Sequence, residues 1–207
     1  TITVNDAADT EVAATTLSDL GLKTAGTVTV TNAVDISGNP SQVTAALVTP
    51  ESRVEVSNVK VTISGNPSVS ELNAIAGATS GVVTATLADT SLSSLGALST
   101  ASTDYITITV NDAADTEVAA TTLSALGQKT AGTVTVTNAV NISGTTVQLI
   151  TALVTTDSMV VANNATVTVT NSDSNTASNL NLINNVINGL VNASAITDIT
   201  GDSSDFL

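Results

Sequence analysis

The sequence predicts a repeat solenoid, an α/β or β solenoid whose coils of roughly 25–29 residues stack through parallel strands and carry short helices. Three observations predict this fold class. Segments 1–38 and 107–144 differ at only three positions, so the sequence repeats with an offset of 106 positions. Shorter units recur inside that long repeat, and Val and Thr alternate within the units. We therefore expect one continuous solenoid over 1–207, with long repeats 1–106 and 107–207 of about four units each.

The alternating segments predict the strands. Val or Ile alternates with Thr at 27–31, 106–110, 133–137 and 166–170, which places aliphatic side chains on one face and hydroxyls on the other. An Asn often follows such a segment directly, as at Asn32, Asn138 and Asn171, and predicts a bend before a second short strand. Asn side chains at matching bends could bond to one another between stacked strands.

Polar residues followed by helical spacing predict one short helix in each unit. Asn39 with Gln42, and Ser68 with Glu71, have the spacing of a capping box. Gly21 and Gly127 each follow a Leu and predict helix ends closed by a left-handed glycine. The predicted units begin near Thr10, Asn39, Asn66, Ser91, Thr116, Thr145 and Ser172.

A second architecture stays open at this point. A long repeat of this size also suits two tandem β-sandwich domains of the immunoglobulin or cadherin type. The shorter internal period, the capping signals and the absence of Trp and Cys favour the solenoid.

Composition excludes most chemistry. The chain has 4 Lys and Arg against 18 Asp and Glu, a net charge of -14, and neither His nor Cys. Nucleic acid and anionic membranes are therefore poor partners, and thiol chemistry, imidazole bases and His or Cys metal sites are impossible. Paired carboxylates could serve a glycosidase or lyase, but Tyr105 and Phe206 are the only aromatic residues available to stack on a sugar. We expect no enzymatic activity and no organic cofactor.

Three acidic motifs are the candidate metal sites. NDAAD occurs at 5–9 and 111–115, and GDSSD at 201–205. Carboxylates three residues apart, with amide oxygens nearby, could bind Ca²⁺, which prefers oxygen ligands. The alternative is that these Asp residues cap the helices that follow. The candidate calcium ligands are Asp6, Asp9, Asp112, Asp115, Asp202 and Asp205.

The many Thr residues are a second candidate surface. A flat strand face of Thr hydroxyls could serve an adhesive or ice-binding module, although Thr is also an ordinary residue for an exposed strand. Sequons for N-linked sugar occur at Asn141, Asn164 and Asn192, and surface glycans are possible partners.

Whole phrases of the chain resemble known repeats. The segment SVSELNAIAGATSGVVTATLADT at 68–90, the segment at 178–205 and the TITVNDAADTEVAATTL pair are similar to tandem repeats of very large bacterial surface or secreted proteins, especially cyanobacterial ones. The resemblance implies an extracellular or cell-surface location and a structural, adhesive or surface-layer (S-layer) role. It transfers no functional residues.

These observations together predict an extracellular structural repeat protein that forms a rod, filament or surface-layer element. Thr1 begins inside a strand pattern and 205–207 begins a new unit, so we expect either a longer natural chain or end-to-end self-assembly. Copies of the protein, joined end to end or laterally, are the expected partners. No segment has the length of apolar sequence that membrane insertion requires.

Overall fold

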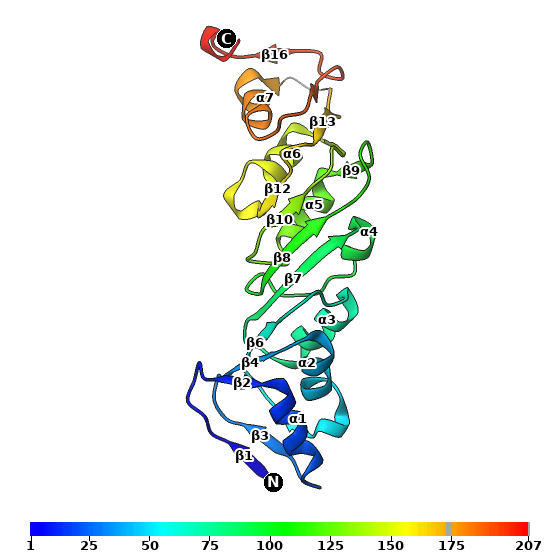
Figure 1. The fold of residues 1–207 in the computed structure, drawn as a ribbon. Helices are drawn as coiled ribbons and strands as arrows, with labels where there is room; N and C mark the ends of the chain where they lie inside the picture. Colours follow the sequence, from blue (N-terminus) through cyan, green and yellow to red (C-terminus); the bar gives the residue numbers. More distant parts are fainter. Residues whose placement is uncertain (173–174, 207) are drawn as a thin grey trace. The chain divides into compact units, whose positions relative to one another are not determined.

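The computed structural model describes residues 1–172 and 175–206 and shows an α/β fold (Figure 1). Within these residues the strands form separate parallel sheets of three, seven, four and two strands, accompanied by seven α-helices. The predicted solenoid is therefore wrong. The short period correctly indicated parallel strands joined through helices, but it could not specify how the strands divide among sheets. Tandem β-sandwiches are also excluded, because such domains are antiparallel whereas these sheets are parallel.

The helices are short, and most have eight to ten residues. The α-helices are α1 (Ala14–Leu22), α2 (Pro40–Leu47), α3 (Val69–Ala78), α4 (Leu92–Leu95), α5 (Ala120–Gly127), α6 (Thr146–Leu153) and α7 (Ala177–Asn184). Three short 3-10 helices are η1 (Pro50–Ser52), η2 (Thr156–Ser158) and η3 (Ser203–Phe206).

The strands are mostly two to four residues long, and β7 and β8 are the longest of those described. The first eight are β1 (Ile2–Val4), β2 (Glu11–Ala13), β3 (Val28–Val30), β4 (Asp35–Gly38), β5 (Val54–Glu55), β6 (Lys60–Ile63), β7 (Val83–Thr90) and β8 (Tyr105–Val110). The others are β9 (Glu117–Ala119), β10 (Val134–Val136), β11 (Asn141–Gly144), β12 (Val160–Val161), β13 (Thr166–Val169), β14 (Asn175–Thr176), β15 (Val191–Asn192) and β16 (Ile199–Thr200).

The chain forms two compact units. Unit 1 contains Thr1–Ala88, Ala97–Thr107 and Lys129–Gly132. Unit 2 contains Asp89–Gly96, Ile108–Gln128 and the chain from Thr133 onward. Each unit includes a segment from the other long repeat: unit 1 includes Lys129–Gly132, and unit 2 includes Asp89–Gly96. Neither unit therefore coincides with a long repeat. The predicted repeats 1–106 and 107–207 are therefore repeats of the sequence, and they are not the compact units of the structure.

Rows of aliphatic residues, buried except for the half-buried Ile2, Val12 and Val54, form the core of unit 1. Parallel pairing places Ile2 beside Val28 and Val28 beside Val54 in one sheet, and Val12, Ile36, Val61 and Val83 side by side in the other. Leu17 of α1, Val43 of α2 and Leu72 of α3 are fully buried and cover these rows. Because a parallel pair needs a crossover between its strands, the helices occupy the connections.

Unit 2 repeats this arrangement. The pairing aligns Ile108, Val134 and Val160 in one sheet and Val118, Ile142, Val167 and Val191 in another. Leu123 of α5 and Leu149 of α6 are fully buried against them.

Most local predictions are confirmed. The alternating segments form β3, β8, β10 and β13, and both capping boxes form, at Asn39 with Gln42 and at Ser68 with Glu71. The predicted left-handed glycines are wrong, because Gly21 and Gly127 lie inside α1 and α5 and neither has a positive φ.

Candidate functional site

The two NDAAD motifs form loops that join two strands. Asp9 and Asp115 both adopt left-handed backbone conformations, with φ of 64° and 63°. The Asp9 N–H donates to the carbonyl of Ala33 at 3.0 Å, and the Asp115 N–H donates to Ala139 at 2.9 Å. Asp tolerates this conformation better than most residues, so its type is explained here by backbone geometry.

The Asn residues of these loops hold neighbouring bends together. Asn32 Nδ2 donates to Asn5 Oδ1 at 3.2 Å and to the Asp6 carbonyl at 2.7 Å. Asn138 makes the same two bonds, to Asn111 Oδ1 at 3.0 Å and to the Asp112 carbonyl at 2.7 Å. The predicted Asn–Asn contacts between bends are therefore present in both repeats.

The predicted capping role of the NDAAD aspartates is wrong for the helices that follow. The N-caps of α1 and α5 are Ala13 and Ala119, and neither makes a side-chain capping bond. Each helix instead continues directly from a strand, β2 or β9. Asp112 caps a helix that precedes it in the chain, since its Oδ2 accepts the N–H of Leu92, the first residue of α4, at 2.7 Å.

The GDSSD motif at 201–205 forms hydrogen bonds between its own residues. Asp205 Oδ2 accepts the backbone N–H of Asp202 at 3.0 Å, and the Asp202 carbonyl accepts the Asp205 N–H at 2.9 Å, at the start of η3. Over residues 1–172 and 175–206, no three carboxylates converge as a group that could hold a metal ion. The structure places the six candidate ligands in three separate segments, with Asp205 inside η3, and calcium binding stays a prediction.

A row of charges, in which Glu11 and Lys60 are exposed and Asp35 is half-buried, crosses unit 1 beside the first motif, and sequence reasoning missed it. The parallel register sets Glu11 beside Asp35 and Asp35 beside Lys60. Lys60 Nζ bonds Asp9 Oδ1 at 2.5 Å, and Thr62 Oγ1 donates to both Asp35 oxygens at 3.1 and 3.2 Å. The hydrogen bond to Asp9, and then the charge of Asp9, raise the pKa of Lys60. Lys60 thus offsets the repulsion between neighbouring carboxylates.

The second repeat lacks this charge arrangement. The matching row reads Glu117, Asn141 and Thr166, so the second carboxylate and the ammonium are lost together. Thr168 Oγ1 donates to Asn141 Oδ1 at 2.9 Å, which preserves the hydrogen bond that Thr62 makes in unit 1. Only a comparison of one long repeat with the other could have revealed this paired change from sequence.

The Thr faces are narrow. In unit 1 the strand pairing places Thr3 beside Thr29 and then Glu55, and in unit 2 it places Thr109 beside Thr135 and then Val161. Each Thr row is thus two strands wide before another residue type interrupts it.

Two of the sequons have engaged side chains. Asn141 accepts the bond from Thr168, and Asn164 Nδ2 donates to the Thr137 carbonyl at 3.0 Å. The exposed Asn192 closes its own turn, since its Oδ1 accepts the Ser194 N–H at 3.1 Å.

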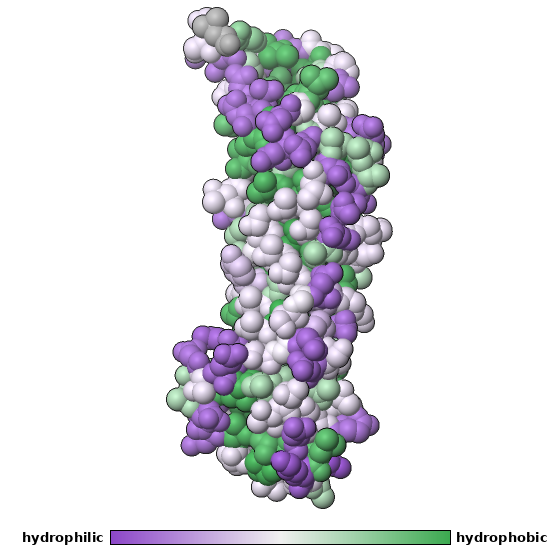
Figure 2. Space-filling model, in the orientation of Figure 1, coloured by the Kyte–Doolittle hydropathy of each residue, from purple (hydrophilic) through white to green (hydrophobic). Residues whose placement is uncertain are grey.

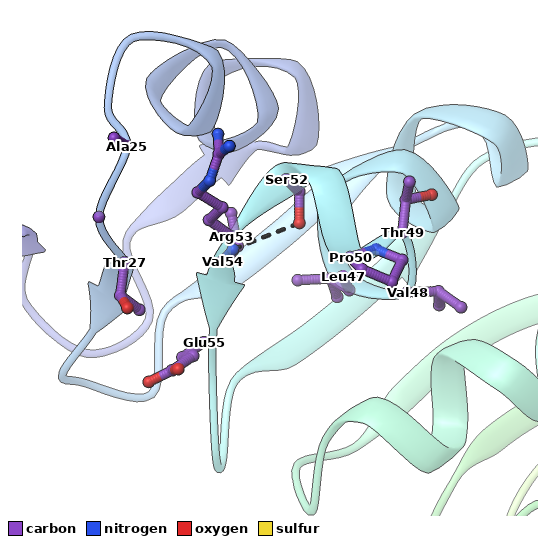
Figure 3. A pocket seen from close by; sticks show the side chains of 11 residues that line it. Ala25, Thr27, Leu47, Val48, Thr49, Pro50, Ser52, Arg53, Val54 and Glu55 are labelled. Atoms are coloured by element: carbon purple, nitrogen blue, oxygen red, sulfur yellow. Dashed lines mark hydrogen bonds between the residues drawn. The ribbon is translucent and has the colours of Figure 1, made fainter.

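A pocket of about 350 Å³ opens in unit 1 beside β5 (Figure 3). Apolar side chains of Leu47, Val48 and Val54 line it together with Arg53 and Glu55. Arg53 Nη1 donates to the carbonyls of Gly21 at 3.3 Å and Thr24 at 3.0 Å, so this cation serves the C-terminal end of α1. In the second repeat Met159 and Val161 stand in the places of Arg53 and Glu55, so the polar lining is not repeated.

Comparison of the chain with protein-family models, with curated proteins and with solved structures finds no match in any of the three. Among the described residues, no helix combines the length and the apolar character that crossing a bilayer would demand.

Proposed function

We propose that the protein is a non-catalytic structural component of an extracellular or cell-surface assembly, a filament or surface layer built from copies of itself. One observation carries the proposal: the two repeats share the features that hold the backbone. The buried aliphatic rows, the Asn bonds between bends, and the left-handed Asp9 and Asp115 occur in both repeats.

Several charged groups differ between the repeats, whereas Asp6, Asp9, Glu11 and Lys23 recur as Asp112, Asp115, Glu117 and Lys129. Asp19, Asp35, Arg53, Glu55 and Lys60 are matched 106 positions later by Ala125, Asn141, Met159, Val161 and Thr166. A repeated binding or catalytic site would need its polar groups in both places. The scaffold is repeated in both halves of the sequence whereas the charged surface is repeated only in part, which supports a structural role.

Composition supports the same role. Without His and Cys, and with Lys scarce, no Ser or Thr has an ordinary activating base. The resemblance to repeats of large bacterial surface proteins supports the proposed location. Net charge of -14 would limit lateral contact between molecules, and divalent cations at the exposed Asp residues would relieve that repulsion.

Electron microscopy of the purified protein, with Ca²⁺ and with a chelator, tests this proposal. Ordered fibres or sheets in either condition are the expected result. Their loss in chelator would assign calcium to the acidic loops. Isolated particles in both conditions, at every protein concentration, would contradict self-assembly. Adhesion or ice binding by a Thr face would then be the next hypothesis, measured by thermal hysteresis.

A further inference from the structure

Four turns have a glycine two residues before a strand, which is β3, β7, β10 or β15. These glycines are Gly26, Gly81, Gly132 and Gly189. A Cβ on Gly81 would lie 2.1 Å from the Val59 carbonyl oxygen, and one on Gly189 would lie 2.2 Å from that of Ala165. Close approach to a neighbouring backbone therefore requires glycine at both positions, whatever residue precedes it.

The residue before the glycine differs in the fourth turn. Ala25, Ser80 and Ala131 precede the first three glycines, whereas Asn188 precedes Gly189, and no other Asn of the chain is followed by Gly. Asn188 is exposed, and so is Ser80 in the second turn, so the exposure belongs to this type of turn. Because glycine has no side chain to hinder its nitrogen, it is the residue whose nitrogen most readily attacks a preceding Asn amide.

A threonine hydroxyl holds the glycine nitrogen in the first three turns. In each of them the glycine N–H donates to the hydroxyl of a Thr two residues earlier, at 2.8–3.0 Å. The pairs are Gly26 with Thr24, Gly81 with Thr79, and Gly132 with Thr130. Ile187 stands at this place in the fourth turn and is 7% exposed. It has no hydroxyl, and within the described residues the Gly189 N–H makes no hydrogen bond.

Backbone bonds nevertheless hold the fourth turn in place. The Asn188 N–H donates to the Asn163 carbonyl at 2.6 Å, and the Leu190 carbonyl accepts the Val167 N–H at 2.8 Å. Corresponding backbone bonds flank Gly81. Over residues 1–172 and 175–206, the side-chain amide of Asn188 makes no hydrogen bond. The fourth turn thus keeps an unbonded amide side chain next to an unbonded backbone nitrogen.

We propose that Asn188 and Gly189 form a self-modification site, at which the chain deamidates without an enzyme. The Gly189 nitrogen loses its proton to solvent and attacks Cγ of Asn188. The new N–Cγ bond closes a succinimide ring, the Cγ–Nδ2 bond breaks, and the departing nitrogen takes a proton from solvent and leaves as ammonia. This inference goes beyond the proposed structural function and does not rest on it.

Water completes the reaction by opening the ring at one of its two carbonyls. Hydrolysis of the N–Cγ bond gives aspartate, and hydrolysis of the bond between the same nitrogen and the backbone carbonyl gives isoaspartate. Nothing is oxidised or reduced, and water is the only co-reactant. Either product adds a negative charge to the turn. Isoaspartate also adds a carbon to the backbone between Asn188 and Leu190, so we expect it to loosen β15 from β13.

The helix before this turn supplies internal controls. Figure 2 shows hydrophilic surface around α7, near the top of the view. Asn181, Asn184 and Asn185 lie in or next to this helix, are exposed, and are not followed by Gly. In the purified full chain at mildly alkaline pH, peptide mapping by mass spectrometry should find Asn188 converted at least about tenfold faster than these three. The rate should rise with pH, because the attacking nitrogen must lose a proton.

Two substitutions at one position test the role of the missing hydroxyl. Ile187→Thr restores the hydroxyl of the other turns, and Ile187→Val is the matched control, since Val has nearly the shape of Thr without the hydroxyl. Folded Ile187→Thr should deamidate at Asn188 at least about tenfold more slowly than folded Ile187→Val, a barrier difference of about 1.4 kcal/mol. In denaturant the two variants should react equally, because the hydroxyl no longer faces the nitrogen.

A third variant leaves the fourth turn untouched. Ser80→Asn creates the same pair with Gly81 in a turn that keeps its Thr79 hydroxyl. Position 80 of this variant should deamidate at least about tenfold more slowly than Asn188 in the same molecules. Equal rates at the two positions, or equal rates for folded Ile187→Thr and Ile187→Val, would overturn the proposal. An Asn188 that stays intact in the folded wild type while the denatured chain reacts would overturn it too.

Discussion

Single glycines set the spacing between helices and their neighbours. A Cβ on Gly21 would lie 1.8 Å from the Ser52 carbonyl oxygen, and one on Gly127 would lie 1.8 Å from that of Ser158. Both contacts are with backbone, which cannot rotate away. Only glycine lets these helices approach the neighbouring backbone so closely. This close approach requires glycine even though glycine destabilises a helix interior relative to alanine.

We therefore predict that Gly21→Ala destabilises the protein by about 1–3 kcal/mol or more, because the helix must move away from η1. Gly77→Ala is the matched control, since Gly77 lies in α3 with nothing within 4 Å of a new Cβ. That control should stabilise by about 0.5–1 kcal/mol. Thermal unfolding of both variants measures the difference, and similar shifts for the two would refute the close-approach explanation.

The capping box of α3 contains a titrating group. The backbone N–H of Ser68 first, and its hydroxyl second, donate to Glu71 and lower the pKa of that carboxyl from its ordinary value. A lowered folded-state pKa gives stability that is present above the unfolded-state pKa and is lost as pH falls through the folded value.

Ser68→Ala should raise the pKa of Glu71 part of the way back, because the backbone donor remains. Carboxyl NMR titration measures this directly. The neutral box of Asn39 and Gln42 is the control. Asn39→Ala should lower the free energy of unfolding by about 0.5–2 kcal/mol, and by the same amount at pH 3 and at pH 7. The destabilisation by Ser68→Ala should be smaller at pH 3 than at pH 7. An unchanged Glu71 titration in Ser68→Ala would rule out the hydroxyl's role.

At the scale of elements, the two repeats differ in the charged residues that neighbouring parallel strands place side by side. Strands β2, β4 and β6 place two carboxylates and Lys60 in a row, while β9, β11 and β13 place one carboxylate beside Asn141 and Thr166. Because Glu11, Lys60 and Glu117 are exposed, each of these charges contributes little alone. The interaction free energy between Asp35 and Lys60 is therefore the quantity to measure.

Lys60→Thr should lower the melting temperature of the wild type, and the loss should shrink as salt screens the row. Adding Asp35→Asn should restore part of the loss, since the double variant reproduces the row of the second repeat. A double-mutant cycle at low and high salt gives the coupling. Additive effects of the two changes would show that Asp35 and Lys60 do not interact.

At the scale of the whole molecule, the compact units do not follow the sequence repeat. Asp104 is buried in unit 1, where its carboxylate accepts the N–H groups of Val83 and Ala101, each at 2.8 Å. The Asp104 carbonyl accepts the Ala131 N–H at 2.7 Å, and Thr130 Oγ1 accepts the Ile106 N–H at 2.8 Å. Unit 1 therefore uses residues from beyond its own repeat.

Because unit 1 includes residues of the second long repeat, the stability of a fragment should depend on where the chain is truncated. A fragment spanning 1–106 should be less stable and more sensitive to protease than a fragment spanning 1–132, because it loses the bonds from Thr130 and Ala131 to Asp104 and Ile106. Urea unfolding and limited proteolysis of the two fragments compare them. Equal stability would mean that the long sequence repeat, rather than unit 1, is the folding unit.

The sequence by itself determined the local elements and the absence of His and Cys. Alternation at 133–137 fixed β10, and side-chain spacing fixed the boxes at Asn39 and Ser68, because a strand face and a helix cap depend on residues a few positions apart. Only the tertiary structure decided the separate sheets, the role of Gly21, the Lys60 row and the bond from Leu92 to Asp112. Those features depend on which distant strands become neighbours, and a periodic sequence allows several such pairings with nearly the same local pattern.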